Sequence, residues 1–183
     1  MVDLMKKADR LELVKLRGVG NYQLGNGAGN ALFPNGIILV HSRKTGKIRL
    51  IYLHGKLLAT LRPRDGQLAL TLEGAKLLLS KRKHLSAYVA VRNEVRDFIK
   101  TGRNVFAKHV THVDKNLRPE DEVIVVDEDR NLLAVGRAAL SGEEIEAFKF
   151  GVGVRVRRGI EESRKHGFNS SPDNRLHMIE GVL

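Results

Sequence analysis

The amino-acid sequence predicts two small folded units: an α+β N-terminal domain built from an antiparallel sheet with helices, then a mainly-β domain. Two patterns carry this prediction. Between residues 37 and 70, short apolar runs alternate with turn residues, and a helical spacing of apolar residues follows from Thr71. From residue 88 onward strand-like segments dominate, broken by short helices and polar turns. We expect domains at residues 1–85 and 86–160, followed by a polar tail at 161–183.

The composition is that of an ordinary globular protein, with 42% hydrophobic and 29% charged residues among 183. Cysteine is absent, which excludes disulfides, thiolate zinc sites and cysteine nucleophiles. No apolar run approaches the roughly 18 to 20 residues that cross a bilayer, and the N-terminus lacks a signal-peptide core. We therefore expect a cytoplasmic protein that does not bind a membrane.

Positive charge is concentrated in the first half of the chain. The net charge is +11, and residues 1–92 hold 17 Lys and Arg against 5 Asp and Glu, whereas residues 93–183 hold 15 against 16. Such asymmetry indicates a polyanionic partner, nucleic acid before an acidic membrane surface. The plainer interpretation is a solvated basic surface that only aids solubility.

The first element expected is a docking helix over residues 3–16, with Leu4, Ala8 and Leu11 on one stripe. Its apolar face lacks Trp and Phe, which argues against a membrane-surface helix. The glycine-rich stretch at residues 18–29 follows no strand and contains no Gly-Lys-Ser/Thr, so a tight structural turn is favoured over a phosphate-binding loop.

Next comes a small antiparallel meander over residues 37–70. Thr71 then caps a helix that ends in the cationic run 81–84, which either complements the helix dipole or faces RNA.

The second unit begins with a strand at residues 88–91 and a short helix that Asn93 caps and Gly102 closes in a left-handed conformation. Ser141 and Glu144 form a capping box for another brief helix. In the last strand, residues 151–157, the valines face inward and the arginines outward. The other strands expected are 110–113, 122–126 and 132–140.

Several segments of this second unit, in order and spacing, resemble a PUA domain over about residues 86–160. They are GRNVFAK at residues 102–108, LRPEDEV at 117–123, VGRA at 135–138 and GVGVRV at 151–156. The preceding stretch resembles the accessory domain before the PUA domain of archaeosine tRNA-guanine transglycosylase, in NYQLG at 21–25, SRKTGKIR at 42–49 and ATLR at 59–62. The chain is thus similar to the non-catalytic C-terminal part of that archaeal enzyme.

The resemblance implies a pseudo-barrel that clamps structured RNA, typically a tRNA acceptor stem and its 3′ end. It also implies that the loop after the first helix of the second domain makes the contact, with Val105 and Ala107 contributing backbone and shape. The loop residues carried over are Gly102, Arg103, Asn104, Val105, Phe106, Ala107 and Lys108.

The residue types leave alternatives open within this loop. Asn104 is suited to a base or 2′-OH contact, or it bonds backbone in a turn. Phe106 is either a base platform or, as a lone aromatic entering a strand, a core anchor, and the core is favoured.

Arg155 and Arg157 share one strand face, which either lines the RNA surface or is solvated. His109 and His112 have no third ligand nearby, so no metal site is expected.

In the first domain a single hairpin carries four cationic residues, and we expect them to make the sequence-independent contact with phosphates. They are Arg43, Lys44, Lys47 and Arg49.

The sequence therefore predicts a non-catalytic protein that recognises structured RNA, most of all tRNA, with a role in RNA modification. The transglycosylase's barrel aspartates and cysteine-rich zinc site have no counterpart here, so we expect no catalytic residue and no cofactor. The alternative is an accessory subunit of an RNA-modification enzyme, in which the N-terminal domain mainly binds protein. Which RNA, which oligomeric state and which partner stay open.

Overall fold

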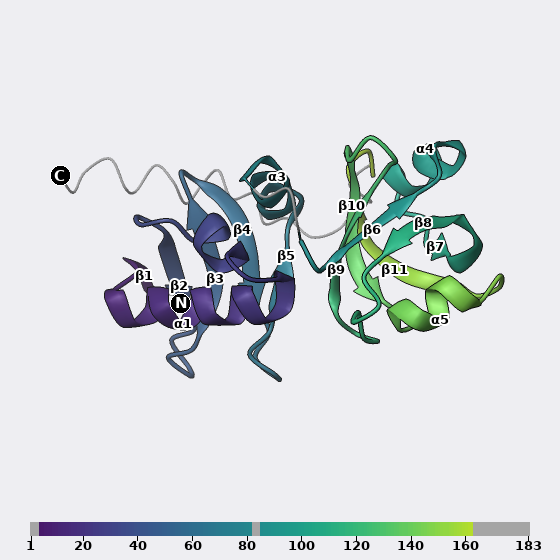
Figure 1. Cartoon of the computed structure of the whole chain (residues 1–183). Coiled ribbons are helices and arrows are strands. Elements are labelled where there is room, and N and C mark those ends of the chain that lie inside the picture. Colours follow the sequence, from purple (N-terminus) through teal and green to yellow (C-terminus); the bar gives the residue numbers. More distant parts are fainter. Residues whose placement is uncertain (1–3, 82–84, 163–183) are drawn as a thin grey trace.

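The computed structural model describes residues 4–81 and 85–162, which form two β-sheets with helices packed on them (Figure 1). The first sheet is fully antiparallel, with its five strands in chain order. The predicted fold class, an antiparallel sheet with helices followed by a nearly closed barrel, is confirmed. The strands of the first sheet are β1 (Leu4–Lys7), β2 (Ile38–His41), β3 (Ile48–Leu53), β4 (Lys56–Leu61) and β5 (Leu68–Leu70).

The N-terminus differs from the predicted helix over residues 3–16. β1 is a strand paired with β2, and α1 (Arg10–Leu24) begins only at the capping box formed by Asp9 and Glu12. In this box the Asp9 carboxylate accepts from the Glu12 N–H at 2.8 Å, and Glu12 accepts from the Asp9 N–H at 3.0 Å. The expected stripe of Leu4, Ala8 and Leu11 therefore does not exist, and α1 buries Leu16, Gly20 and Leu24 instead.

The glycine-rich stretch is mostly helical, so the predicted turn over residues 18–29 is wrong for most of its length. It forms the end of α1 and the start of α2 (Ala28–Leu32), with a turn only between them. A Cβ on Gly20 would lie 2.8 Å from the Gly29 Cα, and one on Gly29 would lie 2.0 Å from the Arg17 carbonyl oxygen. These glycines therefore let two helices approach closely, which no larger residue allows.

The meander over residues 37–70 and the helix that follows are confirmed. The hydroxyl of Thr71 accepts from the Gly74 N–H at 3.1 Å and so caps α3 (Leu72–Lys81). Of the cationic run 81–84, residues 82–84 lie outside the described residues, as does the predicted polar tail beyond residue 162.

Within the part of the chain that the structure describes, the second sheet has six strands in the order β7-β11-β10-β9-β6-β8, of which only β6 and β9 pair in parallel. Gly102 has a φ of 93°, as expected for the end of a helix, and the Ser141–Glu144 capping box is present. Asn93 does not cap a helix with its side chain; the chain passes through a short 3₁₀ turn (Asn93–Val95) into α4 (Arg96–Lys100). The remaining elements are β6 (Tyr88–Val91), β7 (Val105–Phe106), β8 (Val110–Val113), β9 (Glu122–Val126), β10 (Leu132–Ala138), α5 (Gly142–Ala147) and β11 (Val152–Gly159).

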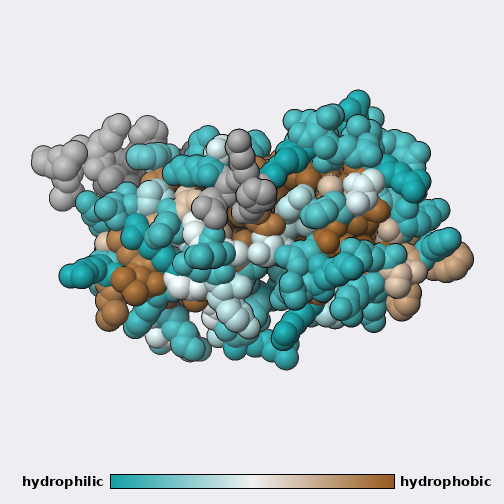
Figure 2. All heavy atoms as spheres, in the orientation of Figure 1, coloured by the Kyte–Doolittle hydropathy of each residue, from teal (hydrophilic) through white to brown (hydrophobic). Residues whose placement is uncertain are grey.

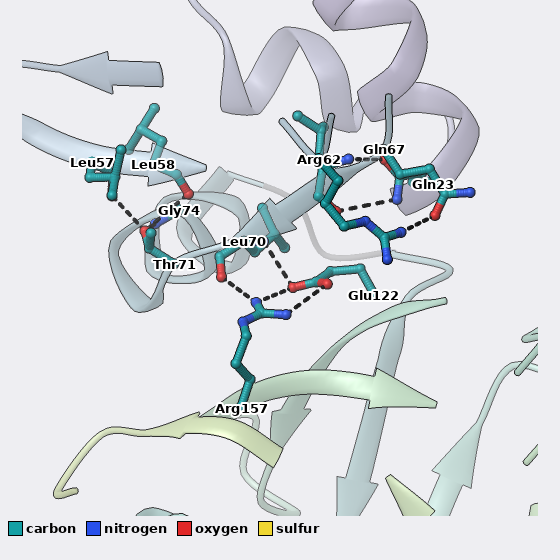
Figure 3. A network of polar contacts seen from close by, with 11 residues as sticks. Gln23, Leu57, Leu58, Arg62, Gln67, Leu70, Thr71, Gly74, Glu122 and Arg157 are labelled. Carbon is teal, nitrogen blue, oxygen red and sulfur yellow. Dashed lines mark hydrogen bonds and ion pairs between the residues drawn. The ribbon is translucent and has the colours of Figure 1, made fainter. Parts of the chain in front are cut away.

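The two sheets meet through a shared apolar core and one polar cluster. Buried Leu24 and Leu78 of the first unit belong to the same cluster as Ile124 and Val135 of the second. Beside this core, the Glu122 carboxylate accepts from the Leu70 N–H at 2.8 Å and pairs with the Arg157 guanidinium, which donates to the Leu70 carbonyl at 2.6 Å (Figure 3). The side chain of Glu122 is completely buried. The contact therefore binds strand β5 of one sheet to β9 and β11 of the other.

Within the described ranges, 4–81 and 85–162, no helix is long and apolar enough to cross a membrane.

Candidate nucleic-acid interface

The loop after α4 is shaped by backbone hydrogen bonds that end the helix. The Gly102 N–H donates to the Ile99 carbonyl at 2.9 Å, and the Arg103 N–H donates to the Phe98 carbonyl at 3.2 Å. A Cβ on Gly102 would lie 3.0 Å from the Glu162 carboxylate. Because an acidic group stands beside Gly102, the anion-binding capacity of this loop rests on the residues that follow the glycine.

Residues 105–107 alternate between the core and the surface. Val105 and Ala107 are buried, whereas the side chain between them, Phe106, is 48% exposed and pairs in register with Val152 of β11. Phe106 is therefore not the core anchor that the sequence favoured; the two small neighbours fill the core, and strand alternation turns the ring outward.

The polar residues of the loop divide into one fixed and two exposed side chains. The amide oxygen of Asn104 accepts from the Val156 N–H at 3.0 Å, which holds the loop against β11 rather than against its own backbone. Arg103 and Lys108 are both exposed. The loop thus presents two cations from a backbone that its asparagine ties to the barrel.

Next to this loop lies an open groove of about 820 Å³ between β8, α5 and the segment that joins α5 to β11. Lys108 lines it from one wall, and Phe148, Lys149 and Phe150 line it from the other. Phe148 is 47% exposed and Phe150 is 85% exposed. Figure 2 shows light-brown, apolar atoms at the tip beyond α5, surrounded by hydrophilic teal surface.

Exposed aromatic rings are concentrated in this half of the molecule. Of the five phenylalanines in residues 4–81 and 85–162, only Phe33 is buried, and the four exposed ones all belong to the second unit. Phe148 and Phe150 were not predicted from the sequence. The available signal was a Phe-Lys-Phe-Gly segment with no strand or helix periodicity, in which apolar residues have no core to enter.

The charged groups around the groove are partly neutralised by neighbours. Glu146 pairs with Lys115 at 3.4 Å, and Arg92 lies 3.7 Å from Glu94. His112 stacks on Tyr88 with a centroid distance of 5.1 Å. No group of three or more His, Asp or Glu residues in the described part of the chain could hold a metal ion.

The two arginines predicted on β11 have different surroundings. Arg155 is exposed and lies 3.3 Å from Glu120, which Arg137 also contacts at 3.3 Å. Arg157 is engaged with Glu122 and Leu70 at the junction of the sheets. Neither arginine lines the groove, although both lie on β11, the strand to which Asn104 ties the loop.

The four cations predicted in the first domain lie on or beside the turn between β2 and β3. Arg43, Lys44, Lys47 and Arg49 are all exposed. A similar turn joins β4 to β5, and in both turns a glycine N–H donates back to the residue four positions earlier, at 2.7 Å from Gly46 and 2.9 Å from Gly66. Figure 1 shows the two turns extending from the same end of the sheet.

Between these turns lies a second groove, of about 560 Å³, which brings Lys47 together with three further cations that were not predicted. Lys15 and Arg64 are exposed, and Arg62 pairs with Asp65 at 3.3 Å. The missed residues come from α1 and from the second turn. The second turn lies near the predicted hairpin because antiparallel pairing places the β2–β3 and β4–β5 turns at the same end of the sheet. They are Lys15, Arg62 and Arg64.

An acidic residue at the inner wall of this second groove is internally compensated. Glu12 lies 3.0 Å from Lys6 and 2.9 Å from the Nε2 of His41. Burial pushes the pKa of Glu12 upward, but the hydrogen bonds from the Asp9 N–H, Lys6 and His41 outweigh it and hold the pKa below its ordinary value. Glu12 therefore stays ionised at neutral pH, paired within the protein.

Comparison with known families divides the chain into two matched regions. Residues 14–84 match the patch-forming domain C2 of tRNA-guanine transglycosylase, and residues 87–160 match the PUA domain.

Curated relatives are archaeal tRNA-guanine(15) transglycosylases. The enzyme of Thermococcus kodakarensis is 46% identical over 144 residues, which are 79% of this chain and 24% of the enzyme. The Methanothermobacter thermautotrophicus enzyme is 41% identical over 148 residues, 81% of this chain and 23% of the enzyme. The chain thus spans about a quarter of the length of these relatives, and it matches their C-terminal region.

Solved structures share the fold across both sheets. A hypothetical protein from Pyrococcus horikoshii OT3 superposes with a TM-score of 0.70 at 16% identity, covering 87% of this chain and 96% of that one. A conserved PUA domain protein from Thermoplasma acidophilum gives a TM-score of 0.62 at 19% identity, covering 85% of this chain and 93% of that one.

Proposed function

The chain is a PUA domain protein similar to the C-terminal region of archaeal tRNA-guanine transglycosylases, and from this premise we propose that it is a non-catalytic protein that recognises tRNA by its acceptor stem and 3′ end. The observation that carries the proposal is the groove in which exposed Phe148 and Phe150 alternate with Lys149 opposite Lys108. The same proposal includes a cytoplasmic location.

The chemistry of this groove fits a single-stranded RNA end. Every base has a π-face that stacks on an aromatic ring, and the lysines between the rings offer charge to the phosphates. Phe106, on the strand edge beside the loop, adds a third exposed ring, and Arg103 and Lys108 add charge. Asn104, whose oxygen is bound to β11, acts by holding the loop in place.

The basic turns of the first domain fit a helical stem. A-form RNA is recognised mainly through its shape and phosphates, and a cluster of exposed cations on two neighbouring turns provides a contact that does not depend on sequence. The cations in this role are Arg43, Lys44, Lys47, Arg49, Lys15 and Arg64. The first domain would supply most of the attraction and the groove would select the single-stranded end.

Binding of purified chain to tRNA tests this proposal. We expect log affinity to fall steeply with log salt, and tRNA that lacks its unpaired 3′ nucleotides to bind about tenfold more weakly. Phe148→Ala with Phe150→Ala should weaken the binding of intact tRNA by at least tenfold and should change the binding of trimmed tRNA little. The matched control is Phe98→Ala, which removes a ring that is 64% exposed outside the groove.

The cationic contacts are tested in the same assay. Lys47→Ala with Arg64→Ala should lower affinity for both RNAs and reduce the salt slope by about one per lost phosphate contact. Arg103→Ala with Lys108→Ala should weaken binding as well. The proposal fails if tRNA is bound no better than heparin and none of these substitutions changes the affinity.

A second function is favoured by a different observation, the exposed apolar residues at the N-terminal end of the molecule. In this alternative the chain is an accessory subunit of an RNA-modification enzyme, and its N-terminal domain mainly binds protein.

A further inference from the structure

The two surfaces that we propose to bind RNA belong to different sheets. The basic turns join β2 to β3 and β4 to β5, whereas the groove that Phe148 and Phe150 line, called here the aromatic groove, lies beside β8 and α5. In the view of Figure 1 the turns and α5 lie along the same lower side of the molecule. An RNA that contacts both surfaces therefore spans the junction between the sheets.

An apolar core holds this junction together. Buried Leu24 and Leu78 of the first unit share one cluster with Ile124 and Val135 of the second. At the end of α1, the Leu24 carbonyl also accepts from the Ser86 N–H, just before β6, at 3.2 Å. Because buried side chains are close-packed, a shift of one sheet against the other would open voids in this core. The core therefore resists a change in the separation of the sheets.

A buried ion pair adds a constraint on orientation. The carboxylate of Glu122 is completely buried and accepts from the Leu70 N–H at 2.8 Å. The guanidinium of Arg157 donates to both oxygens of Glu122 and to the Leu70 carbonyl (Figure 3). A planar guanidinium with several bonds fixes direction as well as distance. Strands β5, β9 and β11 are therefore held in one arrangement.

Both RNA surfaces are attached to strands of this junction. On one side, β5 follows directly from the turn that carries the exposed Arg64. On the other side, the Val156 N–H of β11 donates to the side chain of Asn104 at 3.0 Å, and the loop held in this way leads to Lys108 in the aromatic groove. Arg157 is the next residue of β11 and lines neither groove. The ion pair thus lies between the two surfaces.

We propose that the Glu122–Arg157 pair is a positioning element, which holds the basic turns and the aromatic groove at a fixed separation. The protein then selects RNA by the length of the helical stem that precedes the single-stranded 3′ end. This inference rests on the proposed function and specifies its substrate class. Two contacts on one RNA reinforce each other only when their spacing matches that of the two surfaces. An RNA with a shorter or longer stem reaches one surface at a time and binds more weakly.

Synthetic RNA hairpins test the proposal on the full, unaltered chain. The hairpins share one single-stranded 3′ tail, and their stems differ in steps of one base pair. Affinity, measured by fluorescence anisotropy at constant salt, should be highest at one stem length and fall about tenfold or more on either side of it. Blunt hairpins without the tail lack the second contact and should show no such maximum. Equal affinity across the tailed series would overturn the proposal.

Arg157→Ala tests whether the ion pair sets the length preference. We expect the affinity for the best tailed hairpin to fall about tenfold, and the affinity for the other hairpins to stay unchanged, so that the maximum disappears. Arg158→Ala is the matched control at the next residue of β11, because this side chain lies 4.0 Å from Glu162 and should leave the maximum in place. A folded Arg157→Ala protein that retains the maximum would exclude a positioning role for the pair.

A second variant covers the case in which Arg157→Ala does not fold. Arg157→Lys keeps a counter-charge for Glu122 but lacks the planar fork that bonds both Glu122 and Leu70. The same loss of the maximum is expected, and its persistence would again exclude the positioning role.

The separation of the two units can also be measured without RNA. The chain contains no cysteine, so spin labels at Leu11→Cys and Phe98→Cys, both exposed, report one distance between the units. We expect a single narrow distribution for the unaltered junction and a broader one for the folded Arg157 variant. A broad distribution for the unaltered junction would overturn the proposal.

The outcomes separate this inference from the proposed function. Tight binding of tRNA together with a flat hairpin series would reject the fixed separation alone. Failure to bind tRNA better than heparin would reject the proposed function, and the selection by stem length with it.

Discussion

At one edge of the five-stranded sheet, β5, the outward-facing backbone groups of Leu68 and Leu70 bond to side chains, whereas the opposite edge, β1, lies exposed. The amide of Gln23 accepts from the Leu68 N–H at 2.7 Å and donates to its carbonyl at 3.4 Å. Glu122 and Arg157 do the same for Leu70. Within the described ranges, no further strand pairs with the outer side of β1.

The difference follows from the surroundings of the two edges. β5 lies at the junction of the sheets, where a backbone group without a partner would cost about 1–3 kcal/mol. β1 lies in solvent, where water satisfies the same groups, so folding of the chain does not require the edge to be closed. Two of the four residues of β1 are exposed lysines, Lys6 and Lys7, which discourage pairing with a further strand. The β5 edge therefore contributes to the stability of the chain, whereas the backbone groups at the β1 edge can be satisfied by water.

At the β5 edge, the largest effect is expected from Arg157→Ala. Removal of the guanidinium leaves the Glu122 carboxylate, completely buried, without its counter-charge, and the expected loss in the free energy of unfolding is about 3 kcal/mol. Urea denaturation followed by circular dichroism measures it. Arg155→Ala, two residues away on the same strand and 66% exposed in its side chain, should cost less than about 1 kcal/mol. Equal losses would mean that the junction does not depend on this pair.

A smaller loss is expected from Gln23→Ala, which removes both partners of the Leu68 backbone. We expect a decrease of about 1–2 kcal/mol in the free energy of unfolding, measured in the same way. Its neighbour on α1 provides the control, because Tyr22 is 84% exposed and Tyr22→Ala should change stability by less than about 0.5 kcal/mol. If Gln23→Ala were equally mild, water would replace the amide at this edge.

The β1 side should instead respond to pH through Glu12. Its pKa is lower in the folded state than the ordinary value of 4.5, so the stabilisation is present above that value and is lost as the pH falls through the lower folded pKa. Glu12→Gln should cost about 1 kcal/mol at pH 7, because it removes the charge that pairs with Lys6 and His41, whereas its amide oxygen can still accept from the Asp9 N–H. Denaturation from pH 7 to 3 should show the two proteins converging in acid. Glu143→Gln, at an exposed residue, is the control for loss of charge alone.

The parts of the fold that the sequence predicts are those with local causes. The β2–β5 meander follows from apolar alternation and turn residues, and α3 follows from Thr71. The N-terminus was mispredicted because Leu4, Ala8 and Leu11 fit a helical spacing, although Asp9 and Glu12 already marked where the helix starts.

The parts that sequence reasoning misses depend on distant partners. Arg157 was expected to face RNA, yet it donates to Leu70, 87 positions away, and no pattern in one sequence links these residues. The candidate groove likewise joins residues near 108 to residues near 149, so only the loop half of it was predicted. Phe106 was assigned to the core because a lone ring in a strand usually is; the small size of its neighbours decided otherwise.

The smallest effect on stability should come from the exposed apolar residues on the outer face of α1, Leu11 and Val14. Leu11→Gln with Val14→Gln replaces side chains that are 61% and 59% exposed, so the free energy of unfolding should change by no more than about 0.5 kcal/mol. Leu16→Ala, on the buried face of the same helix, should cost about 2–5 kcal/mol. A large loss from the outer-face pair would mean that these residues stabilise the chain itself. A negligible loss would mean that Leu11 and Val14 have no role in folding, as expected for side chains that are largely exposed to solvent.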